Sequence, residues 1–205
     1  MKSKFGRVIT AMITPFAADG SLDVEGARSL AKWLVEQGNE ALVLAGTTGE
    51  SPTITQDEQI ELVEAVVDAV DVPIIAGAGS NDTRSAIANT QRCVDAGAQA
   101  ILSVTPYYNR PSQAGLMAHF AEVAASTELP IMLYDIPART GRALDADTIL
   151  QLADEVENIV AVKDAAGDVA STARLIAAAP EGFEVYSGED CLTLSLLAVG
   201  AVGTV

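Results

Sequence analysis

Short apolar runs alternate along the chain with stretches in which apolar residues recur at helical spacing. The runs are rich in Val, Ile, Leu and Ala, and they are typical of strands buried on both faces of a sheet. They predict strands over residues 8–13, 41–45, 73–76, 100–104, 131–134, 159–163 and 184–186, and a last strand that begins at Gly203. The chain ends at Val205, inside this last expected strand.

Each predicted strand except the last is followed by a predicted helix. Asp23 is a candidate N-cap for the first helix, and Thr55-Gln-Asp-Glu58 fits the capping box that begins the second. Gly38 is a candidate stop signal for the first helix. The helices are expected over residues 23–37, 55–70, 83–96, 112–126, 145–154, 168–178 and 189–199.

Seven strand–helix units and the beginning of an eighth strand predict an α/β fold, the (β/α)8 or TIM barrel. An open, doubly wound sheet is the alternative. It is disfavoured because the first strand–helix turn has no Gly-rich dinucleotide fingerprint. We expect residues 1–205 to form a single barrel domain that is incomplete at its C-terminus, because a whole barrel needs an eighth helix.

A lysine at the end of a buried strand is the most unusual feature of the chain. Four apolar residues precede Lys163, and an ammonium group is costly to bury unless it is paired or used. The other three lysines lie in the N-terminal tail or on a predicted helix. Lys163 could be structural, paired with Asp164 or another acid. Alternatively, burial lowers its pKa, so that the neutral amine can attack a carbonyl and form a Schiff base.

Polar segments follow other predicted strands at the same end as Lys163. In a barrel, the carboxyl ends of the strands converge on one rim. The segments are residues 46–50, 105–110, 134–141 and 187–190. Each alone could be an ordinary turn, an interface aromatic or a surface cation. Their joint position with Lys163 favours an active site, and the two carboxylates of the last segment argue against a phosphate site there.

Composition excludes several classes of protein. The net charge of −16 argues against an extended nucleic-acid-binding face. An ordinary acidic enzyme and a halophile surface both fit this charge. No apolar run is long enough to span a bilayer, and no signal peptide is evident, so we expect a cytoplasmic protein. Cys93 and Cys191 are expected to be small core residues, and His119 is expected to be structural.

Several motifs in this order resemble the dihydrodipicolinate synthase family of pyruvate-dependent class I aldolases, which also includes N-acetylneuraminate lyase. The resemblance covers essentially all 205 residues. The motifs are Gly46-Thr-Thr-Gly-Glu-Ser51, Thr105-Pro-Tyr-Tyr-Asn-Arg-Pro-Ser112, Tyr134-Asp-Ile-Pro137, Arg139-Thr-Gly141 and Val162-Lys163.

The resemblance implies a lyase that condenses pyruvate with L-aspartate 4-semialdehyde to 4-hydroxy-tetrahydrodipicolinate, on the route to diaminopimelate and lysine. Lys163 would form the Schiff base with pyruvate. The protonated imine would act as the electron sink, so no metal or organic cofactor is expected. Another pyruvate-forming aldolase, of the 2-keto-3-deoxy-sugar-acid or N-acetylneuraminate type, remains an alternative. So do an inactive fragment and a barrel with only a binding or structural role.

The resemblance also implies roles for individual residues. Tyr134 would transfer protons, with Thr47 and Tyr108 as relay partners, and Tyr108 would enter the site of a neighbouring subunit. The protein would then be a homo-oligomer, a tight dimer or a tetramer of such dimers. The substrate-binding residues implied by the family are Thr48, Arg139, Gly188 and Val205.

A lysine feedback site is implied near Ser51, Asn81 and Tyr107. Lysine-sensitive relatives often carry His or Glu at positions that this chain fills with uncharged residues. We therefore expect weak or absent inhibition by L-lysine. The uncharged residues are Gln56, Gln59 and Ser85.

Overall fold

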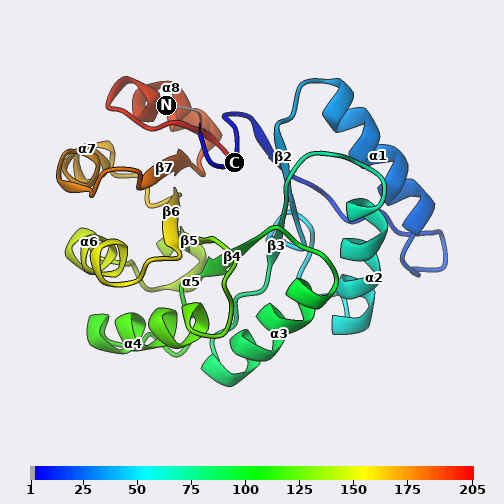
Figure 1. The fold of residues 1–205 in the computed structure, drawn as a ribbon, viewed down its shortest axis with the longest axis horizontal. Helices are drawn as coiled ribbons and strands as arrows, with labels where there is room; N and C mark the ends of the chain where they lie inside the picture. The colour runs from blue at the N-terminus through cyan, green and yellow to red at the C-terminus, as the bar shows by residue number, and fades with distance from the viewer. Residues whose placement is uncertain (1–2) are drawn as a thin grey trace.

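The computed structural model describes residues 3–205. Eight parallel strands of these residues form one sheet in chain order, each paired with the next. A parallel bridge between Val8 and Thr204 joins the last strand to the first, and the Thr204 N–H donates to the Arg7 carbonyl at 2.9 Å. The sheet therefore closes, which confirms the predicted barrel and excludes the open sheet (Figure 1). The strands are β1 (Ile9–Ala11), β2 (Ala41–Leu44), β3 (Ile74–Gly77), β4 (Ala100–Val104), β5 (Ile131–Asp135), β6 (Ile159–Asp164), β7 (Glu184–Ser187) and β8 (Gly203–Thr204).

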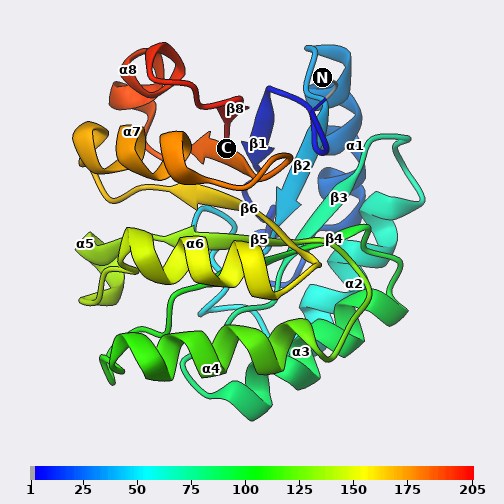
Figure 2. The ribbon, with the colours of Figure 1, turned by 60° about the vertical axis from the view of Figure 1, so that its left-hand side comes forward.

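Helices surround the strands in chain order (Figures 1 and 2). None of them, within residues 3–205, combines the length and apolar character that a bilayer crossing requires. They are α1 (Val24–Glu36), α2 (Gln56–Val67), α3 (Thr83–Asp95), α4 (Gln113–Ala124), α5 (Pro137–Thr140), α6 (Ala146–Glu155), α7 (Val169–Ala178), the 3-10 helix η1 (Asp190–Leu192) and α8 (Thr193–Ala198).

The predicted start signals are confirmed. The Asp23 carboxylate accepts the Gly26 N–H at 2.8 Å, and Thr55 and Glu58 form the capping box. The end of α2 is a correction, because the helix stops at Val67 and not at residue 70. The Ala69 N–H donates to the Val66 carbonyl at 3.0 Å, so the last turn is tightened and the chain leaves the helix there.

Two further predictions need correction near the rim. The helix expected over residues 189–199 is divided into η1 and α8. The short helix α5 was not predicted, although Pro137 at its start and Gly141 in a left-handed conformation at its end are the usual signals. Cys191 lies on η1 and is exposed, so its expected core position is wrong, whereas Cys93 is buried.

Alternation along the strands creates two apolar cores. Leu133 and Val162 belong to the core between the strands and the helices, whereas Tyr134 lies inside the barrel. Because side chains alternate along a strand, Lys163 points inward beside Tyr134. The residues after them, Asp135 and Asp164, face the helices and line a small cavity there. Tyr134 and Lys163 are thus each followed by an acid on the opposite face of the strand.

Candidate active site

A cavity of about 750 Å³ opens at the carboxyl ends of the strands. Its lining combines hydroxyl, guanidinium, amine and carboxylate groups from the ends of β2, β5, β6, β7 and β8. It contains every predicted site residue except Tyr108. Those residues are Thr47, Thr48, Tyr134, Arg139, Lys163, Gly188 and Val205.

Lys163 is buried in this cavity without a counter-ion. Its side chain is 6% exposed, and none of the ion pairs in residues 3–205 involves it. Burial lowers the pKa of Lys163 to about 8, although the Asp190 carboxylate acts in the opposite direction. The structural alternative, an ion pair with Asp164, is not formed, because the Asp164 carboxylate accepts the Ala166 N–H and the Thr172 hydroxyl.

Strand register places Lys163 beside Tyr134. The two residues are partners in the pairing of β6 with β5, and the Lys163 Nζ lies 4.4 Å from the centre of the Tyr134 ring. Gly188 lies against the Lys163 side chain, since a Cβ atom at position 188 would lie 2.8 Å from the Lys163 Cγ. The Gly188 N–H donates to the Asp164 carbonyl at 2.8 Å. Gly188 therefore gives the lysine side chain the room that it occupies.

Tyr134 is 5% exposed, and its phenol is held in the protonated form. Burial raises the pKa of Tyr134, and the neighbouring Thr47 hydroxyl and Arg139 guanidinium only partly offset this effect. A neutral phenol beside an amine and a hydroxyl can donate and accept protons in turn. Tyr134 and Thr47 are therefore placed for proton transfer at whatever is bound to Lys163.

The loop after β2 presents Thr47 and Thr48 to the cavity. Ala45 and Glu50, on either side of the two threonines, have left-handed backbones with φ of 51° and 59°. The Glu50 N–H donates to the Thr47 carbonyl at 3.1 Å, which makes the turn tight. Left-handed geometry at non-glycine residues costs free energy and is concentrated at functional loops. This loop is accordingly built to hold the two hydroxyls at the rim.

Tyr108 lies outside the cavity. Its side chain is 89% exposed and its backbone is left-handed, with φ of 72°. The loop that carries it is nevertheless well held, because the Tyr108 N–H donates to the Thr140 carbonyl and the Arg110 Nε donates to the Gly141 carbonyl. A fixed loop therefore presents a large aromatic side chain to solvent, away from the residues predicted to be its partners.

His119 lies in the middle of α4, away from the cavity. It is 5% exposed, and its Nδ1 forms a hydrogen bond of 2.9 Å with the Thr83 hydroxyl. Burial lowers the pKa of His119. The position agrees with the structural role expected from the sequence.

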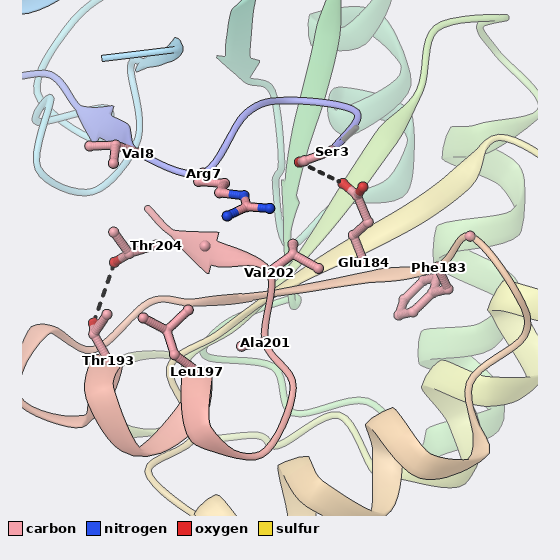
Figure 3. Close-up of a pocket in the computed structure, with 12 residues that line it drawn as sticks. Ser3, Arg7, Val8, Phe183, Glu184, Thr193, Leu197, Ala201, Val202 and Thr204 are labelled. Atoms are coloured by element: carbon pink, nitrogen blue, oxygen red, sulfur yellow. Dashed lines mark hydrogen bonds between the residues drawn. The ribbon is translucent and has the colours of Figure 1, made fainter. Parts of the chain in front are cut away.

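Another cavity, of about 620 Å³, lies beside β7, β8 and α8 (Figure 3). The carboxylate in its lining, that of Glu184, already accepts hydrogen bonds from the Ser3 and Tyr186 hydroxyls. Apolar side chains such as Val8 and Leu197 form much of the rest. No lysine, cysteine or histidine is among its lining residues, so it does not compete as a site of covalent chemistry.

Sequence reasoning missed several residues of the active-site cavity. Residues 8–11 of the first strand and Thr204 of β8 contribute to its wall. Their only signal was position, since all of them are apolar or carry a hydroxyl that is ordinary in a strand. Asp190 was recognised as a rim acid, but its effect on the pKa of Lys163 depends on the fold and has no local signal.

Comparison with known proteins agrees with this geometry. The model of the dihydrodipicolinate synthetase family matches residues 4–205. The chain belongs to this family. A curated relative from Acidothermus cellulolyticus, named 4-hydroxy-tetrahydrodipicolinate synthase, is 55% identical over 98% of the chain and 65% of its own length. A relative of the same name from Moorella thermoacetica is 52% identical over 98% of the chain and 70% of its own length.

Solved structures of the family superpose closely. The dihydrodipicolinate synthase of Cyanidioschyzon merolae, determined with lysine bound, has a TM-score of 0.98 and 47% identity over 100% of this chain and 70% of that one. A dihydrodipicolinate synthase of Bacillus anthracis gives a TM-score of 0.97 and 46% identity over 99% of this chain and 70% of that one. The chain thus spans about two thirds of the length of the relatives that it matches.

Proposed function

We propose that the protein condenses pyruvate with L-aspartate 4-semialdehyde to form 4-hydroxy-tetrahydrodipicolinate, as a class I lyase of lysine and diaminopimelate biosynthesis. The observation that carries this proposal is the buried, unpaired amine of Lys163 in the rim cavity. The family and the names of the curated relatives support the choice of substrates. Such a biosynthetic reaction is consistent with the cytoplasm as the site of action.

The lowered pKa of Lys163 explains how the amine can act as a nucleophile. With a pKa of about 8 in place of 10.5, the neutral fraction at pH 7.5 rises by roughly two orders of magnitude. The neutral amine attacks the keto carbon of pyruvate, and loss of water gives a protonated imine. Loss of a methyl proton then gives an enamine, whose carbon attacks the aldehyde. The substrate's amino group finally displaces Lys163 from the imine carbon.

The remaining residues are assigned by where they lie around Lys163. Tyr134 and Thr47 move protons during imine formation and release. Thr47 and Thr48 bind the pyruvate carboxylate. Arg139 faces the same cavity, and its planar guanidinium suits the carboxylate of the semialdehyde.

The exposed side chain of Tyr108 belongs, in this proposal, to the site of a neighbouring subunit. Its rigid, strained loop and its 89% exposure support that assignment. The working unit would then be a tight dimer, within a tetramer. Tyr108→Phe and Lys163→Met subunits, each nearly inactive alone, are expected to regain activity when mixed and refolded together. In a mixed dimer one site has both an intact lysine and an intact partner tyrosine. Mixtures that remain as inactive as the separate variants would contradict an exchanged tyrosine.

Inhibition by L-lysine is expected to be weak or absent. A cavity of about 370 Å³ lies beside Tyr107 and includes Ser51, Gln56 and Gln59. Its lining residues contain one charged side chain, Arg139, and no carboxylate, so the two ammonium groups of lysine have no opposite charge to pair with. Initial rates should change little with about 1 mM L-lysine. Half-inhibition below that concentration would contradict the prediction.

The proposed function is tested by trapping the imine. The protein is incubated with pyruvate and borohydride, and the adduct is mapped by mass spectrometry. A reduced pyruvate adduct on Lys163, together with condensation activity when L-aspartate 4-semialdehyde is supplied, supports the proposal. An adduct without activity on the semialdehyde points to another pyruvate aldolase. No adduct on the folded protein overturns the mechanism.

A further inference from the structure

Two buried acids lie directly behind the active-site residues. Asp135 follows Tyr134 on β5, and Asp164 follows Lys163 on β6. The acids are register partners, as are the residues that precede them. Asp135 is 3% exposed and Asp164 is 8% exposed. Both line a small cavity of about 30 Å³, which is enough for a water molecule.

The two carboxyl groups have unequal hydrogen-bond partners. In Asp164, one oxygen accepts the Ala166 N–H at 2.9 Å and the other accepts the Thr172 hydroxyl at 2.5 Å. In Asp135, only Oδ1 is recorded as an acceptor, from the Leu144 N–H at 3.0 Å and from the Thr105 hydroxyl at 3.5 Å. No group in residues 3–205 donates to its Oδ2.

The charges around Asp135 are all of its own sign. Asp164 faces it from β6 and Asp145 from the start of α6, while Asp168 at the start of α7 lines the same small cavity. Lys163 projects to the opposite face of the sheet. Burial, more than these charges, raises the pKa of Asp135 to about 7. The one buried cation nearby is therefore not placed to neutralise the acid pair.

We propose that Asp135 is a positioning residue, which carries a proton up to neutral pH and, beside the buried Asp164, ties the end of β5 to Thr105 and to Leu144. These hydrogen bonds, together with those of Asp164, then fix the backbone that carries Tyr134 and Lys163. The catalytic consequence rests on the proposed function, whereas the protonation of Asp135 does not.

The sign of the effect follows from the direction of the shift. The pKa of Asp135 is higher in the folded protein than in the unfolded chain. At a pH between these two pKa values, the folded protein therefore binds a proton that the unfolded chain has lost. The stability that depends on this proton is complete at low pH and is lost as the pH rises through about 7. Above it, Asp135 is a buried anion that faces other acids without a cation, and the end of β5 loosens.

The test compares Asp135→Asn with wild type across pH. The amide has the shape of the neutral acid, keeps the acceptor for the Leu144 N–H, and cannot ionise. The melting temperatures of variant and wild type should be close at about pH 5.5, and the variant should become the more stable by pH 8.5. The rate of pyruvate imine trapping, variant relative to wild type, should rise about threefold or more over the same range. A Tm difference that does not change with pH would overturn the proposal.

Asp147→Asn is the matched control. It removes the same charge from an exposed acid on α6 that is not among the charges acting on Asp135, and its Tm and trapping rate should follow those of wild type at every pH. An equal change in this control would overturn the proposal, because a general charge effect would then suffice.

A direct titration needs no variant. In wild-type protein with carbon-13-labelled aspartate carboxyls, the buried Asp135 signal should titrate near pH 7. A midpoint below about 5 would overturn the proposal even if the asparagine variant did not fold. Neither the melting temperature nor this titration requires catalysis. Failure to trap an imine would therefore refute the proposed function separately from the acid pair.

Discussion

Lys163→Met is expected to abolish the pyruvate adduct and to lower kcat by more than about 10³-fold, because no other amine lies in the cavity. The same variant is expected to be more stable than wild type at pH 7, by about 1–3 kcal/mol. Methionine fills a similar volume and carries no charge to desolvate. A residue whose removal destroys activity and improves stability is retained for its chemistry.

The pH dependence of this stability gain identifies its cause. The pKa of Lys163 is lower in the folded protein than in the unfolded chain, so burial of the charged amine costs stability below about pH 8. That cost disappears as the pH rises towards 10.5. Urea unfolding should therefore show that the stability gain of Lys163→Met is smaller near pH 10.5 than at pH 7. Lys32→Met, at an exposed position on α1, is the control and should change neither activity nor stability appreciably. A less stable Lys163→Met protein would show that the amine is held by a favourable contact.

Tyr134→Phe is expected to lower kcat by about 10²–10³-fold while the protein remains folded. The phenyl ring keeps its packing over the Lys163 amine and loses only the hydroxyl that can move protons. Imine trapping should slow by a similar factor, because formation of the imine needs a proton donor for the departing water. Steady-state kinetics and the trapping rate measure the two effects separately.

Tyr186→Phe provides the matched control for the loss of a buried tyrosine hydroxyl. Tyr186 is buried inside the same barrel, but its hydroxyl bonds to Ser3 and Glu184 at the other end of β7. This variant should lose about 1–2 kcal/mol of stability and keep its kcat. If Tyr134→Phe retained full activity, the proton relay would have to be assigned to other groups.

Sequence periodicity was sufficient for the order of the elements. The runs that become β4 and β5 are buried on both faces, so their apolar character is visible without knowledge of their neighbours. The start of α2 was equally local, because the capping box lies within four residues. The end of α2 and the short helix α5 were missed or misplaced, since weak local signals compete there with the geometry of the rim.

The candidate site likewise contains residues that the sequence indicated and a residue whose surroundings only the structure shows. Lys163 was singled out from the sequence, because a lysine after an apolar strand is unusual in itself, whereas the role of Tyr134 was implied by the family resemblance. The exposure of Tyr108 was not visible in the sequence, since it depends on a left-handed loop anchored to the carbonyls of Thr140 and Gly141. Its proposed place in a neighbouring subunit came from the family resemblance alone.

The sequence by itself thus determined the α/β barrel, the strand ends that carry reactive groups, and the amine on which the proposed chemistry depends. These features follow from the types of residue and their spacing along the chain. Only the tertiary structure decided that Lys163 has no ion-pair partner within residues 3–205 and that Asp135 and Asp164 line one small cavity. The physical reason is that desolvation and charge pairing depend on residues distant in the chain. Which of them meet is set by the register of neighbouring strands and the closure of the barrel.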